Sequence, residues 1–369
     1  MFRFLQRLFE HSASKPLPSS SSRKSAKLCL EQLESRSVPS VNVVNTAFGN
    51  PEVFAIGTDG QVYAQILGNN GLGSTGYFLV APGQVKDIQV TRDAFGDPEL
   101  FVIGLDDRIY AERMTAGGLP LIGYFLTAGG QVNSMIAGRD AFGNPEVFAI
   151  GLDNRVYANH FNNIGLTATG FFLTASGQVN SISMTNDAFG DPEVFAIGLD
   201  NQVYAERFSS IGLTSTGFFL TAFGQVKSIT AGRDAFGDPE LFAIGLDNRV
   251  YANHFNNIGL TSDTGLFLTA TGQVNSIAVG HDAFGDPEVF AIGLDNQVYA
   301  EAFSSIGETS TGFFLTTPGQ VKTITYGHDA FGDPKVFAIG LDNQVYAERL
   351  SANGLLSSGF FLTTAGQVM

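Results

Sequence analysis

Short apolar runs separated by glycine, aspartate and asparagine recur along most of the chain. In one such unit, residues 178–184 alternate, residues 193–198 are almost wholly apolar, and residues 202–208 and 217–221 are rich in aromatic side chains. Short runs of β-branched and aromatic residues bounded by turn formers predict strands. The Asp-Asn pair at 200–201 predicts a tight hairpin turn. Each unit therefore predicts four antiparallel strands, and nothing in it predicts a helix.

The unit is repeated through the chain, and the tripeptide Ala-Phe-Gly marks each copy. Its spacings are 47, 47, 47, 47, 48 and 47 residues. A period of this length predicts a repeat architecture, and four antiparallel strands per period favour a propeller blade over a solenoid coil. The copies begin at Ala47, Ala94, Ala141, Ala188, Ala235, Ala283 and Ala330.

The two ends of the repeat region complement each other. The chain stops at Met369, partway through what would be an eighth first strand, and the missing positions are found at Ser40-Val-Asn42. Closing a ring of blades in this way removes the exposed sheet edges of an open array. The sequence therefore predicts an all-β fold: a seven-bladed β-propeller of four-stranded blades over residues 40–369, closed by the N-terminal segment completing the last blade.

The composition of the chain agrees with a large folded domain and limits the classes of partner that this domain can bind. Of the 369 residues, 44% are hydrophobic and 15% are charged, which indicates a substantial core. Residues 1–39 carry seven Lys/Arg and three acids, whereas the remainder carries 13 Lys/Arg and 32 acids. So acidic a domain repels phosphate backbones, and we expect no nucleic-acid partner. Cys29 is the single cysteine, so no internal disulfide is possible, and no apolar run is long enough to span a membrane.

Residues 1–39 are basic and serine-rich, and we expect a disordered targeting or tail segment. Leu30-Glu-Gln-Leu-Glu-Ser-Arg-Ser-Val-Pro-Ser40 resembles the Leu-Glu-x-Leu-Glu-x-Arg-x-x-Pro-Ser segment found near the start of many exported proteins of planctomycete bacteria. The resemblance implies an extracellular or cell-envelope location.

The repeat also resembles a known family. Glu193-Val-Phe-Ala-Ile-Gly-Leu-Asp-Asn-Gln-Val-Tyr-Ala205, followed by Gly217-Phe-Phe-Leu-Thr221, is similar to the repeat of tectonin-like and fucose-binding bacterial propeller lectins. The resemblance covers residues 40–369 and implies multivalent carbohydrate binding. Tryptophan positions of that family are Tyr204, Phe208 and Phe218 here, and its histidine after tryptophan is Ala205.

The phenylalanine of each Ala-Phe-Gly turn is the first candidate ligand contact, because turn tips usually carry polar residues or glycine. Two interpretations are open. Each ring folds down into the groove between blades as part of the core, which we expect, or the rings form stacking platforms for sugars. The candidates are Phe95, Phe142, Phe189, Phe236, Phe284 and Phe331, with Phe48 at the equivalent position of the first copy.

Basic residues precede the first aspartate of several turns. We expect each to form a local ion pair with that aspartate, or else to join it in hydrogen-bonding a sugar hydroxyl. The candidate ligand-binding residues of this kind are Arg92, Arg139, Arg233, His281 and His328, with Asp140, Asp187 and Asp234. We expect Asp187 and Asp191 to accept hydrogen bonds from turn amides rather than to bind calcium, and we expect no metal and no cofactor.

Nothing in the sequence predicts an enzyme. The histidines are isolated, no nucleophile motif or phosphate-binding loop is present, and an active site usually breaks the symmetry of repeats. The prediction is a non-enzymatic, multivalent, lectin-like protein. Its partners would be glycans or cell-surface polysaccharide, bound on the face that carries the Ala-Phe-Gly turns. The alternative is a structural or protein-interaction propeller of the cell envelope, which would bind envelope proteins without sugar specificity.

Overall fold

The computed structural model describes residues 41–73, 75–165, 169–212, 216–222, 224–259, 265–307, 311–366 and 368. All of them belong to the second of the two units into which the chain divides, Ser37–Met369. The expected N-terminal tail, Cys29 and the export-like segment lie outside the described residues. No helix in the described ranges is both long and apolar enough to cross a membrane.

The fold is all-β, and neighbouring strands within every sheet are antiparallel. Three sheets have four strands each, in the order of the chain. Their strands are β1 (Val41–Asn45), β2 (Pro51–Ile56), β3 (Val62–Ile66) and β4 (Phe78–Ala81); β5 (Val85–Arg92), β6 (Pro98–Gly104), β7 (Ile109–Arg113) and β8 (Phe125–Leu126); and β23 (Val321–His328), β24 (Pro334–Gly340), β25 (Val345–Arg349) and β26 (Phe361–Leu362).

Two further sheets have seven strands each, because one long strand serves two successive repeats. At these two junctions the chain stays extended through residues 172–186 and 267–281. The strands are β9 (Val132–Arg139), β10 (Pro145–Gly151), β11 (Arg155–His160), β12 (Phe172–Asn186), β13 (Pro192–Gly198), β14 (Val203–Arg207) and β15 (Phe219–Ala222); and β16 (Val226–Arg233), β17 (Pro239–Gly245), β18 (Arg249–His254), β19 (Phe267–His281), β20 (Pro287–Gly293), β21 (Val298–Ala302) and β22 (Phe314–Thr317).

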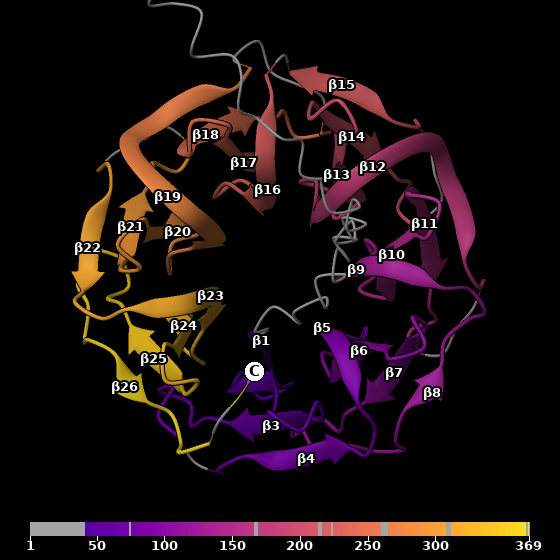
Figure 1. The fold of residues 1–369 in the computed structure, drawn as a ribbon, viewed down its shortest axis with the longest axis horizontal. Coiled ribbons are helices and arrows are strands. Elements are labelled where there is room, and N and C mark those ends of the chain that lie inside the picture. The colour runs from indigo at the N-terminus through magenta and orange to yellow at the C-terminus, as the bar shows by residue number, and fades with distance from the viewer. Residues whose placement is uncertain are drawn as a thin grey trace, which may run out of the picture. The chain divides into compact units, whose positions relative to one another are not determined.

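The strand sets of the repeats are arranged around a central opening in a propeller-like plan (Figure 1). The first strand of a repeat, such as β5 or β16, lies next to the opening, and the fourth, such as β4 or β22, lies at the rim. First strands of consecutive repeats contact one another, as β5 and β9 do. The residues that end these inner strands are thus brought together although they are about 47 positions apart in sequence.

The core lies between adjacent repeats. All seven residues of β13 are buried, and its equivalents in other repeats are buried throughout as well. Phe148 of β10 packs on Phe208, which follows β14 of the next repeat, with ring centroids 4.8 Å apart. A buried aromatic side chain contributes roughly 1.5–3 kcal/mol by leaving water. Each repeat is therefore stabilised mainly by its neighbours, as expected of a propeller.

The two ends of the described chain meet in the first sheet. Val368 pairs antiparallel with Gly57, and its N–H donates to the carbonyl of Asn343 at 2.8 Å. Its side chain is buried in a cluster that includes Val41 and Phe337. Residues from the beginning and the end of the repeat region thus share one apolar cluster.

Candidate functional site

Six of the seven Ala-Phe-Gly turns are held by a buried aspartate, and buried Thr46 takes its place in the first turn. Asp187 is 1% exposed, and its Oδ1 accepts hydrogen bonds from the backbone N–H groups of Phe189 and Asp191, both at 2.9 Å. Asp140 and Asp234 make the same pair of bonds in their own turns. The prediction that Asp187 accepts turn amides is confirmed, because an aspartate at the first position of a turn can satisfy backbone donors two and four residues on. For Asp191 the prediction was wrong, because its Oδ2 instead accepts a hydrogen bond from Arg207 at 3.1 Å.

The phenylalanine of each Ala-Phe-Gly turn is exposed, so the expectation that it folds into the groove between blades was wrong. The seven side chains are 63% to 71% exposed, whereas aromatic residues at such positions are usually buried. They are Phe48, Phe95, Phe142, Phe189, Phe236, Phe284 and Phe331. The alternative interpretation, a set of solvent-facing platforms, is the one compatible with these exposures.

Close contact between successive turns explains why the rings point outward. Gly190 has a φ of +85°, and a Cβ placed on it would lie 3.2 Å from the Cα of Ala141 in the preceding turn. Gly143 is equally close to Ala94. The alanine and the glycine of adjacent turns thus fill the space between them. A phenyl ring has no room there and projects into solvent.

The turns also lie beside the long loops between the third and fourth strands. The N–H of Ala188 donates to the carbonyl of Asn257 in the next repeat at 3.3 Å, and Ala94 donates in the same way to Asn163. The ring of Phe48 reaches the loop of the next repeat, since a Cβ on Gly117 would lie 3.9 Å from its Cε2. Each Ala-Phe-Gly turn therefore lies against the loop between the third and fourth strands of the neighbouring repeat.

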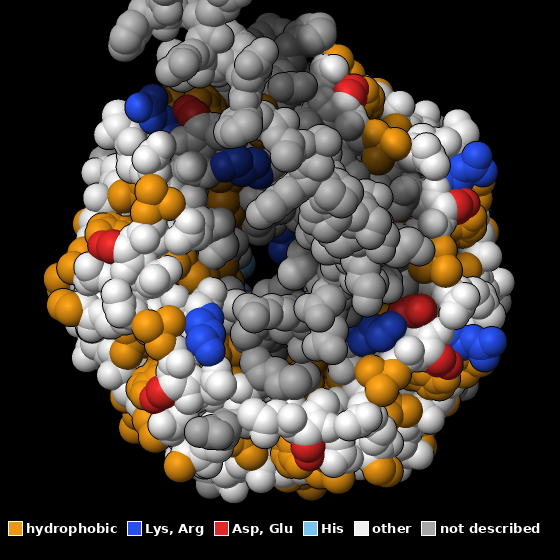
Figure 2. Space-filling view, viewed as in Figure 1, with side chains coloured by type: hydrophobic (Ala, Val, Ile, Leu, Met, Phe, Trp, Pro, Cys, Tyr) orange, Lys and Arg blue, Asp and Glu red, His pale blue; other side chains and the backbone are white. Residues whose placement is uncertain are grey.

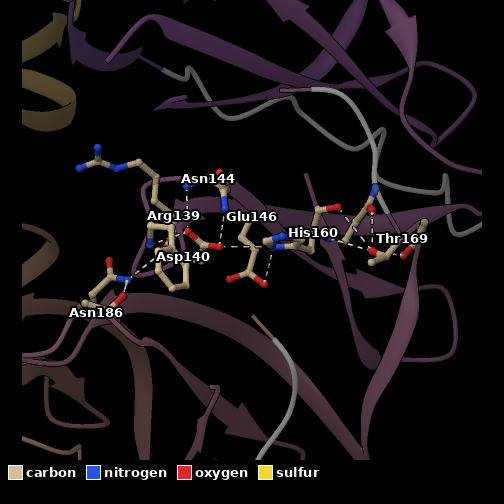
Figure 3. Close-up of polar contacts among 11 residues, drawn as sticks. Arg139, Asp140, Asn144, Glu146, His160, Thr169 and Asn186 are labelled. Carbon is tan, nitrogen blue, oxygen red and sulfur yellow. Dashed lines mark hydrogen bonds and ion pairs between the residues drawn. The ribbon is translucent and has the colours of Figure 1, made fainter. Parts of the chain in front are cut away.

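The basic residues that precede these aspartates are placed differently from our expectation of a local ion pair. Arg139 points away from the cluster around Asp140 (Figure 3), and no described carboxylate forms an ion pair with it. Instead Asp140 faces His160, whose Nδ1 lies 3.8 Å from Asp140 Oδ2. Asp187 likewise pairs with Arg207, at 3.0 Å. The partners of Asp140 and Asp187 thus come from the third strand of the repeat, because each turn directs its carboxylate towards that strand.

A buried glutamate adjoins each of these pairs and was missed in the sequence. Glu146 is fully buried, and its Oε1 lies 3.8 Å from Nδ1 of His160 (Figure 3). Burial, and then the charge of Asp140, raises the pKa of Glu146 to about 8. Lys335 takes the equivalent place in the last repeat, with its Nζ 3.5 Å from Asp329 Oδ2. A single charged residue recurring in an otherwise apolar strand was the signal that could have revealed this layer.

One group of these side chains has the spacing of a metal site. Ligand atoms of Asp234, Asp238 and His254 lie within 4.8 Å of one another. Asp234 already caps two turn amides, and Nδ1 of His254 lies 3.3 Å from Oε1 of Glu240. The bond to Glu240 raises the pKa of His254. Protein partners thus account for the positions of these side chains, and the expectation of no metal stays a prediction.

Cavities lie at the opposite ends of the strands, where sequence reasoning placed no site. A cavity of about 770 Å³ is lined by Leu199, Asp200, Tyr204, Phe218 and Gln178. An equivalent one, of about 980 Å³, recurs in a later repeat. The hydroxyl of Tyr204 donates to Oδ2 of Asp200 at 2.9 Å, so these two polar groups of the cavity wall are hydrogen-bonded to each other. In the space-filling view, apolar side chains form separate clusters around the ring rather than one patch (Figure 2).

No family model matches the chain, and no curated protein matches it either. Solved structures do. The BP39L lectin from Burkholderia pseudomallei superposes with a TM-score of 0.76 at 11% identity, covering 89% of this chain and 99% of the lectin. Identity this low shows the fold alone: the chain has the fold of a propeller lectin.

The same fold is also found in enzymes. The periplasmic gluconolactonase PpgL of Pseudomonas aeruginosa has a TM-score of 0.58 at 16% identity, covering 90% of this chain and 98% of the enzyme. A putative 6-phosphogluconolactonase of Bacteroides fragilis has a TM-score of 0.59 at 12% identity, covering 89% and 96%. The expectation that this chain is not an enzyme is therefore corrected: proteins named as enzymes share its fold, so the fold does not exclude an enzyme.

Proposed function

We propose that the chain is a multivalent carbohydrate-binding protein whose sites lie between adjacent repeats at the Ala-Phe-Gly end. The observation that carries the proposal is the exposure of one phenyl ring in every turn. Large aromatic side chains contribute strongly to binding interfaces, and here one recurs at the same exposed position of every turn. The propeller-lectin fold supports the same reading.

We propose further that the repeats form seven four-stranded blades in a closed ring. Val368 pairs with Gly57 as Val179 pairs with Gly198 inside the chain. The C-terminal residues would thus begin the inner strand that β1 continues. The last turn joins the first repeat as well, since the N–H of Ala330 donates to the carbonyl of Asn69 at 3.0 Å.

In such a site, the phenyl ring would pack against the C–H face of a sugar, and loop groups of the next repeat would bind its hydroxyls. For Phe189, the neighbouring loop contains Asn256 and Asn257, and for Phe142 it contains Ser209 and Ser210. A shallow site of this kind binds weakly, but several on one rigid body bind a polymeric glycan with avidity. Cell-surface polysaccharide is the partner class that fits best, and we place the protein outside the cell or in its envelope.

A glycan array probed with the purified full-length protein tests the proposal. The comparison is a variant in which all seven turn phenylalanines are replaced by serine. We expect the wild type to bind a subset of glycans and the variant to lose that binding while keeping its circular dichroism spectrum.

Two results would overturn the proposal. Glycan binding that survives in the serine variant but disappears in Tyr204→Ala and its equivalents would move the site to the cavities at the other end. Failure to bind any glycan, together with recovery of an envelope protein through the same phenylalanines, would favour a protein-interaction module.

A further inference from the structure

The inner strands end in a set of basic residues at matching positions. In the register of the sheets, Arg92, Arg139 and Arg233 each pair with the proline that begins the second strand, and His281 and His328 do the same. Inner strands contact one another around the opening. The five side chains therefore occupy one level of the ring.

The two histidines of this set are in direct contact. Nε2 of His328 lies 3.2 Å from Nδ1 of His281, and their ring centroids are 4.5 Å apart. Burial, followed by the charges of Arg92 and Arg233, lowers the pKa of Arg139 to about 10. These guanidinium groups therefore repel each other through the opening. Basic side chains are visible inside the opening in the space-filling view (Figure 2).

These arginines lack the counter-charges that other basic residues have. Among the described residues, no carboxylate forms an ion pair with Arg92, Arg139 or Arg233, although acids outnumber basic residues 32 to 13 after residue 39. By contrast, Arg207 contacts two aspartates. Asp140, next to Arg139, accepts hydrogen bonds from its turn amides. Its oxygens lie towards His160, and the Arg139 guanidinium points away from them (Figure 3).

We propose that the central opening binds a phosphate or sulfate group between the guanidinium groups of Arg92, Arg139 and Arg233. A planar guanidinium presents paired N–H donors that match two oxygens of such an anion. Burial lowers the pKa of both histidines, that of His328 to about 3. At neutral pH they are therefore uncharged hydrogen-bonding groups beside the arginines. A doubly charged anion would offset the repulsion among the three guanidinium groups, which no described carboxylate does.

This site is separate from the exposed phenylalanines, and the two proposals can fail independently. The anion is either free or carried on a larger molecule such as a sugar phosphate or a sulfated glycan. Both sources share the tetrahedral oxyanion that the arginines recognise.

Isothermal titration and thermal melting with inorganic phosphate and sulfate test the proposal on the full-length protein. The test variant is Arg92→Gln/Arg139→Gln/Arg233→Gln. The matched control is Arg108→Gln/Arg155→Gln/Arg249→Gln, which removes the same charge from three hairpin arginines that contact Asp106, Asp153 and Asp247. We expect both anions to bind and to raise the melting temperature of the wild type and of the control. We expect no binding and no shift in the test variant.

Absence of binding to the wild type at millimolar anion, or equal loss in both triple variants, would overturn the proposal. Glucose 6-phosphate, glucose and phosphate then identify the source. Tighter binding of the sugar phosphate than of phosphate indicates a carried anion, and equal binding indicates a free one. The variant without the seven phenylalanines should still bind phosphate, which separates this site from the proposed glycan sites.

Discussion

The carboxylate of Asp187 accepts the backbone N–H of Phe189 at 2.9 Å, so a buried acid fixes the base of an exposed aromatic ring. The same relationship recurs between Asp140 and Phe142. The turn is thus rigid where it meets the protein and apolar where it meets solvent. A turn with a rigid base and an apolar tip can bind a ligand without a change in its own conformation.

Removing the exposed ring should leave stability unchanged. Phe189 is 63% exposed, so Phe189→Ala should change the free energy of unfolding by no more than about 0.5 kcal/mol. Leu199→Ala, at an exposed hairpin tip at the other end of the repeat, is the matched control. Urea unfolding measures both. A loss of several kcal/mol for Phe189→Ala would mean that the ring packs against the protein.

Removing the aspartate should destabilise the protein. Asp187→Ala leaves two backbone N–H groups unbonded in a buried turn, which costs about 1–3 kcal/mol. Asp187→Asn keeps an oxygen that can accept both bonds and should cost less. Thermal unfolding measures the stability of both variants. Equal losses of stability would show that Asp187 stabilises the protein through its ion pair with Arg207 rather than through its hydrogen bonds to the turn amides.

The glycine of the long loop should be intolerant of a side chain. A Cβ on Gly212 would lie 1.7 Å from Oε1 of the buried Glu146, whereas one on Gly217 would meet nothing within 4 Å. Both glycines have a positive φ, so each alanine variant carries a backbone penalty of about 1–2 kcal/mol. Gly212→Ala should cost clearly more in urea unfolding. Adding Glu146→Ala to it should recover part of the difference, and absence of any recovery would contradict the contact.

The buried glutamates should make stability depend on pH. Burial raises the folded-state pKa of Glu193 to about 9, above its unfolded value. Its contribution to stability is therefore fully present below about pH 4.5 and is lost as pH rises towards 9. Glu193→Gln cannot ionise, so the variant should be more stable than the wild type at pH 9 while the two differ least at acid pH. Urea unfolding at several pH values measures this.

Asp200→Asn is the control for that experiment. A backbone hydrogen bond from Gln202, and then the hydroxyl of Tyr204, lowers the pKa of Asp200. Its contribution is present above its unfolded pKa and is lost only as pH falls. Asp200→Asn should therefore leave the profile between pH 7 and about 9 unchanged. If Glu193→Gln and Asp200→Asn changed the pH dependence of unfolding equally between pH 7 and about 9, ionisation of the buried glutamates would not be the cause of the stability loss at alkaline pH.

The chain ends provide a test of ring closure. Val368 and Val179 are both 3% exposed, and the N–H of each donates at 2.8 Å to a hairpin carbonyl, that of Asn343 and that of Asn154. If the ring is closed, Val368→Ser should cost as much as Val179→Ser, about 1–3 kcal/mol. Calorimetry measures both. A near-zero loss for Val368→Ser would indicate an open array.

Much of this fold could be predicted from the sequence because its signals are local and repeated. Apolar runs such as residues 193–198, with the Asp-Asn pair that follows, indicate a strand and a hairpin wherever they occur. The period adds that neighbouring repeats must cover each other's apolar faces. The role of Asp187 was predictable for the same reason, since both its acceptor and its donors lie within one turn.

Contacts between repeats were decided only by the tertiary structure. Phe189 faces solvent because Ala141 and Gly190, 49 residues apart in the chain, fill the space between two turns. Arg139 points away from Asp140 (Figure 3), because the carboxylate of Asp140 is directed to its own turn amides and to His160. The sequence by itself determined which residues form each repeat. The packing of one repeat on the next determined which side chains are free to bind, because a side chain's direction depends on neighbours that no local pattern contains.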